Sequence, residues 1–221
     1  MTAPRFRPLE FGVTRVHLRD GVPGTHYLMA EQPLVGFPDR LTDRLRHWAQ
    51  VAPDRTLFAR RTKLADGKLG DWRHVSFGEA WGTARNIAQS LINRGLNAER
   101  PVAILSENSI EHALLSLGCL IAGVPFVPVS PPYSLVSQDY DKLRHVLNTV
   151  TPGMVFASDA RYAKAIQATV SADMEVVLAE GSVEARTVTT FADLCKTHAT
   201  AAVDAAMAAT GPDTIVKFLF T

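Results

Sequence analysis

The sequence has little cysteine, no excess of either charge and no long apolar run. Its 221 residues include only Cys119 and Cys195, and 23 Lys plus Arg stand against 22 Asp plus Glu. Two distant cysteines, without a second Cys or His at ligand spacing, exclude a disulfide scaffold and a zinc site. A net charge close to zero gives no field for nucleic acid or an anionic membrane, so a small-molecule partner is favoured.

The chain also lacks the signals of export and of membrane insertion. Its first residues, MTAPRFRPLEFG, contain no apolar core of a signal peptide, and no uninterrupted apolar run is long enough to span a bilayer. Two cysteines expected in the core fit a reducing compartment. We therefore expect a cytoplasmic protein that makes no contact with membranes.

Common catalytic motifs are absent as well. The sequence has no Gly-rich phosphate loop, no His-Glu-x-x-His, no nucleophile elbow and no close carboxylate pair. His112, His145 and His198 fall on expected helices, where a structural role is several times more common than catalysis. The residues by themselves assign no catalytic side chain and no metal ligand.

Residues 100–132 predict a strand, a helix and a second strand. Val102–Leu105 is an apolar run without alternation, which is typical of a strand covered on both faces. Asn108, with Glu111 three residues later, is expected to cap the helix, and Gly123 is expected to end it. Phe126–Val129 supplies the second strand. Short joints between these elements imply a right-handed parallel unit, which places the chain in the α/β class.

The pattern continues on both sides of this unit. Ser76 and Glu79 form a capping box at the start of a long amphipathic helix that ends near Gly95. Ser137 is expected to cap another helix. The further expected elements are a helix at 41–51, a hairpin of 56–60 with 72–75, strands at 154–157, 175–178 and 214–220, and a helix at 160–170. We expect a mostly parallel, doubly wound sheet flanked by helices.

Two regions have a weaker pattern. Residues 1–38 are rich in Pro and Gly, with extended pieces at 13–18 and 26–29 joined by the turn Arg19–Gly21, and we expect an arm on the surface of the α/β portion, residues 39–221. Residues 180–211 are dominated by Thr and Ala. Weak helical pieces are possible at 191–198 and 202–209, but a surface segment is the safer prediction.

Some side chains could bind a ligand. Ser106, Glu107 and Asn108 follow a predicted parallel strand at the carboxyl edge of the sheet, where open α/β folds bind ligands. Helix capping already accounts for Asn108, and we favour that role. Ser130–Tyr133 could line a pocket, but a stiff crossover loop is the preferred interpretation.

The basic and aromatic residues also have two interpretations each. Arg60, Arg61 and Lys63 could meet a nucleotide phosphate, but on a hairpin a solvated edge that discourages strand pairing is favoured. Three tryptophans are too far apart in sequence to form a stacking platform, and we expect them to anchor the core. These are Trp48, Trp72 and Trp81.

Several stretches resemble the adenylate-forming enzymes. WRHVSFGEAW at Trp72–Trp81 resembles their first motif, and SLGCLIAGVPFVPVSP at Ser116–Pro131 resembles their second. DTIVKFLFT at Asp213–Thr221 is similar to the strand that runs into their phosphate-binding loop. Tyr27–Arg61 resembles the opening segment of feruloyl-CoA synthases. The resemblance covers nearly the whole chain, most specifically residues 34–131 and 213–221.

The resemblance implies an ATP-dependent carboxylate:CoA ligase. In that family a carboxylate attacks the α-phosphorus of ATP to give an acyl adenylate and pyrophosphate, and the thiol of coenzyme A then displaces AMP. Magnesium offsets phosphate charge, and the protein orients and stabilises the transferring group. A hydroxycinnamic acid such as ferulate is the implied substrate. The opening segment favours a CoA ligase over a luciferase-like oxygenase or a carrier-protein loading enzyme.

The sequence departs from the family at Thr221, where the phosphate loop would begin. Only Thr221 is assigned to cofactor binding by the resemblance, and the remaining nucleotide and substrate contacts would lie downstream. Absent backbone amides cannot bind phosphate, so we expect residues 1–221 alone to be an inactive amino-terminal fragment that holds no cofactor.

A second hypothesis is a non-catalytic α/β binding or assembly module that keeps the same scaffold. An incomplete sheet would expose apolar edges, so self-association is expected as well.

Overall fold

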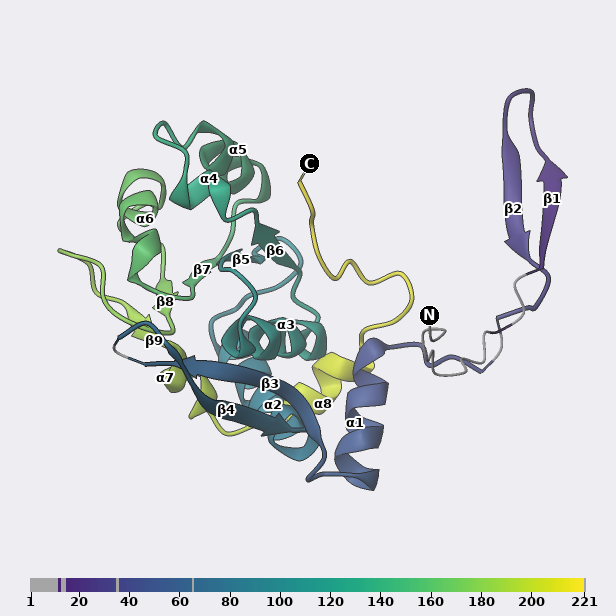
Figure 1. The fold of residues 1–221 in the computed structure, drawn as a ribbon, viewed down its shortest axis with the longest axis horizontal. Coiled ribbons are helices and arrows are strands. Elements are labelled where there is room, and N and C mark those ends of the chain that lie inside the picture. The colour runs from purple at the N-terminus through teal and green to yellow at the C-terminus, as the bar shows by residue number, and fades with distance from the viewer. Residues whose placement is uncertain (1–11, 13–14, 35, 65, 221) are drawn as a thin grey trace, which may run out of the picture. The chain divides into compact units, whose positions relative to one another are not determined.

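A sheet of five parallel strands forms the centre of residues 39–221 (Figure 1). The computed structural model describes residues 12, 15–34, 36–64 and 66–220. The spatial order is β6-β5-β7-β8-β9, and every pairing in this sheet is parallel. The strands are β5 (Val102–Leu105), β6 (Phe126–Val129), β7 (Met154–Ala157), β8 (Val176–Leu178) and β9 (Thr189–Thr190). The predicted α/β class and parallel sheet are confirmed.

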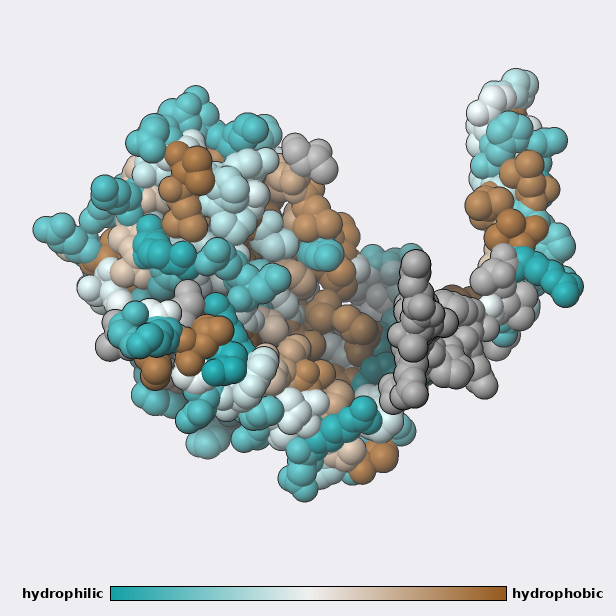
Figure 2. All heavy atoms as spheres, viewed as in Figure 1, coloured by the Kyte–Doolittle hydropathy of each residue, from teal (hydrophilic) through white to brown (hydrophobic). Residues whose placement is uncertain are grey.

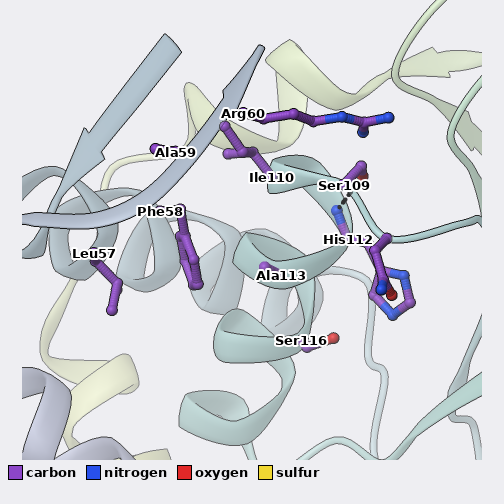
Figure 3. A pocket seen from close by; sticks show the side chains of 10 residues that line it. Leu57, Phe58, Ala59, Arg60, Ser109, Ile110, His112, Ala113 and Ser116 are labelled. Atoms are coloured by element: carbon purple, nitrogen blue, oxygen red, sulfur yellow. Dashed lines mark hydrogen bonds between the residues drawn. The ribbon is translucent and has the colours of Figure 1, made fainter. Parts of the chain in front are cut away.

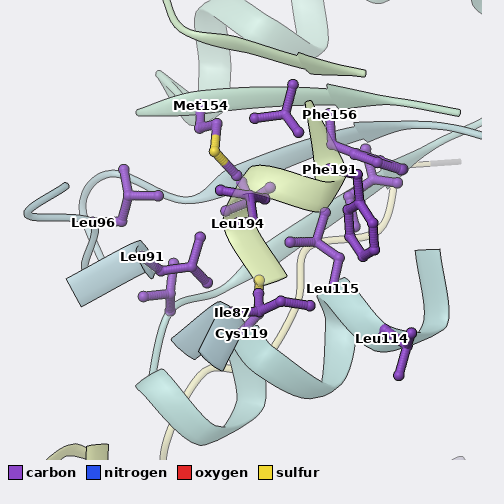
Figure 4. Close-up of a cluster of buried hydrophobic side chains, with 14 of the residues drawn as sticks. Ile87, Leu91, Leu96, Leu114, Leu115, Cys119, Met154, Phe156, Phe191 and Leu194 are labelled. Atoms are coloured by element: carbon purple, nitrogen blue, oxygen red, sulfur yellow. The ribbon is translucent and has the colours of Figure 1, made fainter. Parts of the chain in front are cut away.

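β5 is covered on both faces, as its unbroken apolar run predicts. Val102 and Ile104 belong to a core cluster with α2 (Phe77–Asn93), α3 (Ile110–Ala122) and α7 (Phe191–Cys195), part of which is shown in Figure 4. Ala103 and Leu105 belong to a second cluster on the other face, with α5 (Asp141–Val150) and α6 (Ala163–Thr169). All four residues of β5 are fully buried. The sheet is therefore doubly wound.

The helix starts at 77, 110 and 141 test the capping predictions. Ser76 and Glu79 form the predicted capping box of α2, with each side chain accepting from the other residue's backbone N–H. For α3 the prediction is wrong by one residue. Ser109, not Asn108, has the extended backbone of a cap, and its Oγ accepts from His112 N at 3.0 Å. Asn108 and Ser109 are both residue types that commonly cap helices, and the extended backbone of Ser109 makes it the cap.

The start of α5 also differs from the prediction. Ser137 Oγ accepts from Tyr140 N at 3.1 Å, but this bond closes a turn that precedes the helix. Tyr140 has φ 58°, a left-handed conformation that interrupts any helix running from Ser137, so α5 begins at Asp141. The expected loop at 130–133 is in part a short helix, α4 (Pro132–Leu135), which Pro132 can begin because its missing N–H needs no partner there.

Residues 180–211 are more ordered than predicted. They contain β9, α7 and α8 (Ala201–Ala208), and the helices carry the fully buried Leu194 and Val203. α7 and α8 pack against α2, and α8 also packs against α3. Helices of five and eight residues are marginal by themselves even where they are rich in Ala, so burial of these apolar side chains stabilises them.

The predicted strand at 214–220 is wrong in the described residues. The segment makes a single bridge between Lys217 and Phe126, in which Phe126 N donates to Val216 O and Phe218 N donates to Phe126 O, both at 3.1 Å. The next donor of β6 along this edge would be residue 128, and Pro128 has no N–H. The ladder therefore stops after one bridge.

The described part of the chain also contains two antiparallel hairpins. β3 (Thr56–Lys63) pairs with β4 (Leu69–Ser76), which confirms the predicted hairpin and lengthens both strands. β1 (Val16–Asp20) pairs with β2 (His26–Ala30), as the extended pieces and their turn predict, although residues 13 and 14 lie outside the described part. Backbone contacts divide the chain into two units, residues 1–38 and 39–221.

The remaining helical elements are α1 (Leu41–Val51), as predicted, and a short 3-10 helix, η1 (Ala160–Tyr162), that leads into α6. None of the helices in the described part of the chain is both long enough and apolar enough to cross a membrane.

A tight contact between α2 and α3 generates the first prediction. A Cβ on Gly118 would lie 2.5 Å from Ile87 Cγ2 and 3.2 Å from Ala84 O. We expect Gly118→Ala to lower the free energy of unfolding by about 1–3 kcal/mol through overpacking, measured by urea denaturation. Gly82→Ala on α2 is the control: nothing lies within 4 Å, and a gain of up to about 1 kcal/mol is expected. An equal effect of both changes would contradict the contact.

Candidate active-site cleft

Acidic residues follow three neighbouring strands at matching positions. Leu105 of β5 is level with Ala157 of β7, and Ala157 is level with Leu178 of β8. Glu107, Asp159 and Glu180 each come two residues after these strand ends. Because parallel strands place their carboxyl ends at one edge, the three carboxylates come to the same edge of the sheet.

This edge includes the point where the strand order reverses. After β5 the chain crosses to β6 on one side, and after β6 it returns to β7 on the other side of β5. The connections that leave β5 and β7 therefore diverge, and open α/β sheets bind ligands in the crevice that results. A cleft of about 360 Å³ lies here, lined by the loops after β5, β7 and β8 and by residues of the β3–β4 hairpin.

Arg161 connects two of the three loops. Its Nη2 donates to Glu107 Oε2 at 2.7 Å, and its Nε donates to Asp159 Oδ1 at 2.9 Å. The Arg161 guanidinium, as the main cause, holds the pKa of Asp159 below its usual range. The hydrogen bonds that Arg161 donates to both carboxylates, to Asp159 first, raise the pKa of Arg161. The ends of β5 and β7 are therefore held together by one charged network.

The hairpin contributes the opposite wall of the cleft. Arg73 on β4 forms an ion pair with Glu111 in the first turn of α3. Arg61 Nε donates to Gly70 O at 2.5 Å, and its guanidinium lies 5.6 Å from the centre of the Trp72 ring. Both contacts lie within the hairpin, so Arg61 stabilises the hairpin. Arg60 also lines the cleft. The wall is basic, but Arg73 is already paired with Glu111, and Arg61 already contacts Gly70 and Trp72.

A second hollow, of about 660 Å³, lies between β3 and the start of α3 (Figure 3). Leu57, Phe58 and Ala113 give it apolar lining, and Arg60 and His112 give it polar lining. His112 Nδ1 lies 3.4 Å from Glu107 O. Burial is the main cause that lowers the pKa of His112, so its imidazole is neutral at pH 7. The hollow joins the cleft through residues that line both.

The charged groups of the cleft suit the binding of a polar ligand. Among the residues that the structure describes, no three metal-ligating side chains gather. Burial, the main cause, raises the pKa of the Cys195 thiol to about 11, and Cys119 is fully buried with a still higher pKa. Neither thiol is poised to act as a nucleophile. Guanidinium groups and carboxylates balance across the cleft, which suits orientation of a polar ligand.

The comparison with known families identifies the scaffold. Residues 45–221, more than half of the chain, match the family described as AMP-binding enzyme. The chain belongs to this family. Its parallel sheet and flanking helices resemble those in the solved structures of CoA ligases and of a luciferase.

Individual relatives are more distant. The chain is 30% identical to malpinin synthetase of Mortierella alpina over 100 residues, which is 45% of this chain and 1% of that protein. It resembles the structure of a benzoate CoA ligase from Burkholderia xenovorans with a TM-score of 0.57 and 22% identity, over 79% of this chain and 32% of that one. A luciferase from Phrixothrix hirtus gives a TM-score of 0.56 and 18% identity, over 75% and 30%. The chain thus spans about a third of these structures.

Within this AMP-binding enzyme chain, some predicted site residues meet and others do not. Glu107 and Asn108 line the cleft at the carboxyl edge of the sheet, where they were predicted to lie, and ligand binding by them stays a prediction. The capping role given to Asn108 is wrong. Ser106 is buried, and its Oγ donates to Glu107 O. Thr221, the predicted cofactor residue, lies outside the described residues. Trp72 is 56% exposed on the hairpin, so its predicted core role is wrong.

Two of the histidines considered in the sequence analysis, His145 and His198, lie away from the cleft. His145 on α5 makes an edge contact with the Phe220 ring at 6.2 Å. His198 is exposed between α7 and α8 rather than on a helix, which corrects that prediction.

Sequence reasoning missed several residues that line the cleft. Asp159 and Glu180 carry the same signal as Glu107, a carboxylate two residues after a buried strand, and applying that rule to each strand would have found them. Arg161 follows Asp159 closely enough to be found with it. Arg73 and Glu111 carry no such signal, because their meeting depends on how the hairpin packs against α3.

The stabilisation from the Arg161–Asp159 interaction should depend on pH. Because the folded-state pKa of Asp159 is depressed, the stabilisation is present above the ordinary carboxyl pKa of about 3.9 and is lost as pH falls through the lower folded value. We expect Arg161→Gln to cost about 0.5–1 kcal/mol at pH 6, since Arg161 is half exposed, and less at pH 3, by urea denaturation.

Lys164→Gln, a change at an exposed cation on α6, is the control and should show no such pH dependence. A loss in Arg161→Gln that is equal at both pH values would contradict the Arg161–Asp159 interaction.

Proposed function

We propose that the chain is the amino-terminal part of an ATP-dependent carboxylate:CoA ligase. Such an enzyme joins a carboxylate to the α-phosphorus of ATP with loss of pyrophosphate, and the thiol of coenzyme A then attacks the acyl carbonyl and releases AMP. The observation that carries the proposal is the match of residues 45–221 to the AMP-binding enzyme family. The parallel sheet with a cleft at its switch point supports it.

We propose an aromatic acid, of the hydroxycinnamic type, as the substrate, and a cytoplasmic location. The resemblance of residues 27–61 to the opening of feruloyl-CoA synthases supports this choice. The benzoate CoA ligase among the similar structures is, by its name, a ligase for an aromatic acid. ATP with Mg²⁺ and coenzyme A are the cofactors of the proposal, and Thr221 is proposed to begin the phosphate loop.

The described residues fit phosphate only in part. Guanidinium groups are the right chemistry for phosphate oxygens. In the cleft, however, Arg73 pairs with Glu111, and Arg161 pairs with Glu107 and Asp159. A phosphate would have to displace a carboxylate from either arginine. This competition supports the expectation that residues 1–221 alone bind ATP weakly and do not adenylate.

A second candidate is an assembly module. Three apolar side chains of the C-terminal segment, Ile215, Val216 and Leu219, are between 43% and 65% exposed. Figure 2 shows hydrophobic surface where Figure 1 draws this segment. Large exposed apolar residues along a sheet edge favour association. Light scattering at rising concentration is expected to show dimers of residues 1–221 that Leu219→Asp weakens. A strict monomer would exclude this candidate.

Pyrophosphate exchange tests the main proposal. A longer protein that contains this chain is expected to exchange labelled pyrophosphate into ATP with ferulate or a related aromatic acid, and at least tenfold more slowly with an aliphatic acid such as octanoate, because an aromatic pocket would reject a flexible chain. Residues 1–221 alone are expected to show no exchange. The assay without any acid is the control.

Exchange by residues 1–221 would contradict the inactivity of the fragment. Failure of the longer protein with every carboxylic acid in the panel would contradict the ligase itself.

A further inference from the structure

Arg40 connects the start of the α/β unit to a segment 170 residues later. Its Nε donates to Thr210 O at 2.9 Å and to Thr210 Oγ1 at 3.1 Å, and its Nη2 donates to Ala208 O at 3.3 Å. The Arg40 side chain is 27% exposed. Arg40 directly precedes α1, and Figure 1 shows α1 beside α8. One guanidinium therefore binds three acceptors at the end of α8.

The acceptors explain why arginine is needed. The last carbonyls of a helix lack partners within the helix and carry its negative dipole end. Arginine presents several N–H donors in a rigid fork, whereas lysine presents a single compact ammonium. Arg40 Nη1 also lies 3.6 Å from Asp43 Oδ2 on α1, and this ion pair helps to orient the guanidinium.

The segment after Thr210 has few other attachments at its start. Gly211 N donates to Thr214 Oγ1 at 2.9 Å, and Thr214 N donates to Gly211 O at 3.1 Å, so residues 211–214 form a tight turn. Thr210 itself packs against the end of α3, where a Cβ on Gly123 would lie 3.2 Å from Thr210 Cγ2. Beyond the turn, the single bridge at Phe126 follows. Since Pro128 stops the ladder there, the Arg40 contact sets much of the path of the segment.

We propose that Arg40 is a positioning residue that fixes residues 211–220, and through them the nucleotide. The inference rests on the proposed function, in which this segment leads into the phosphate-binding loop. The start of this segment is held by the Arg40 contacts and by the turn at 211–214, whereas Phe218 and Phe220 farther along pack against the core cluster of α5 and α6. Arg40 therefore sets the position at which the segment leaves α8. Loss of the Arg40 fork therefore displaces whatever the segment carries, without removing any group that touches the nucleotide.

Hydrogen exchange on residues 1–221 tests the positioning. Arg40→Gln and Arg40→Lys are both expected to speed amide exchange of residues 209–220 about tenfold, the effect of losing one to two hydrogen bonds, while β5 exchanges as before. Arg44→Gln is the control, because Arg44 is an exposed cation on α1, the helix that Arg40 directly precedes. It should leave residues 209–220 unchanged.

Arg40→Lys decides between two roles and guards against a failure of Arg40→Gln to fold. If Arg40 acted only as a charge beside Asp43 or the helix end, lysine would restore wild-type exchange, and that result would overturn the proposal. Unchanged exchange in Arg40→Gln would overturn it too.

The longer protein supplies a second readout. Arg40→Lys is expected to raise KM for MgATP about threefold to tenfold in pyrophosphate exchange and to leave KM for the acid unchanged. A purely structural loss would lower the rate with both KM values unchanged, which would overturn the proposal. An inactive unsubstituted protein would instead refute the proposed function, and the hydrogen-exchange result on residues 1–221 would then decide on Arg40.

Discussion

The placement of β5 between β6 and β7 is the constraint on which the rest of the structure depends. A strand with parallel neighbours on both sides has no edge, and helices cover both of its faces. Its four residues must therefore all be apolar, and they are. The crossovers from β5 to β6 and from β6 to β7 lie on opposite sides, which opens the cleft at the carboxyl edge.

In this member of the AMP-binding enzyme family, the carboxyl edge of the sheet carries polar side chains, whereas the strands themselves are apolar. The three carboxylates after β5, β7 and β8 lie along the same edge because the strand ends are level, and Arg161 bonds to two of them, Glu107 and Asp159. The hairpin adds a basic wall from a different part of the chain. Charged groups placed on a rigid sheet in this way suit the orientation of a polar ligand.

The sequence predicted the elements whose signal is local. Val102–Leu105, Leu41–Val51 and the box of Ser76 and Glu79 have the structure that their apolar pattern or capping chemistry indicates. Elements that depend on distant partners were predicted only weakly, as at 191–198 and 202–209, or wrongly. α7 and α8 pack against α2, and a β-prone run at 214–220 makes only one bridge in the described residues because of Pro128 in another strand. Within the cleft, Glu107 was predictable from its own strand, but the pairing of Arg73 with Glu111 was not.

The central claim is the parallel register of β5 with its two neighbours, and nuclear Overhauser contacts on labelled protein test it most directly. The account predicts cross-strand contacts between Ala103 and Val155 and between Leu105 and Ala157 on one side, and between Ala103 and Val127 on the other. Contacts in an antiparallel pattern, or a register shifted by one residue, would contradict it, because a shift by one would turn each β5 side chain to the opposite face and separate the carboxylates.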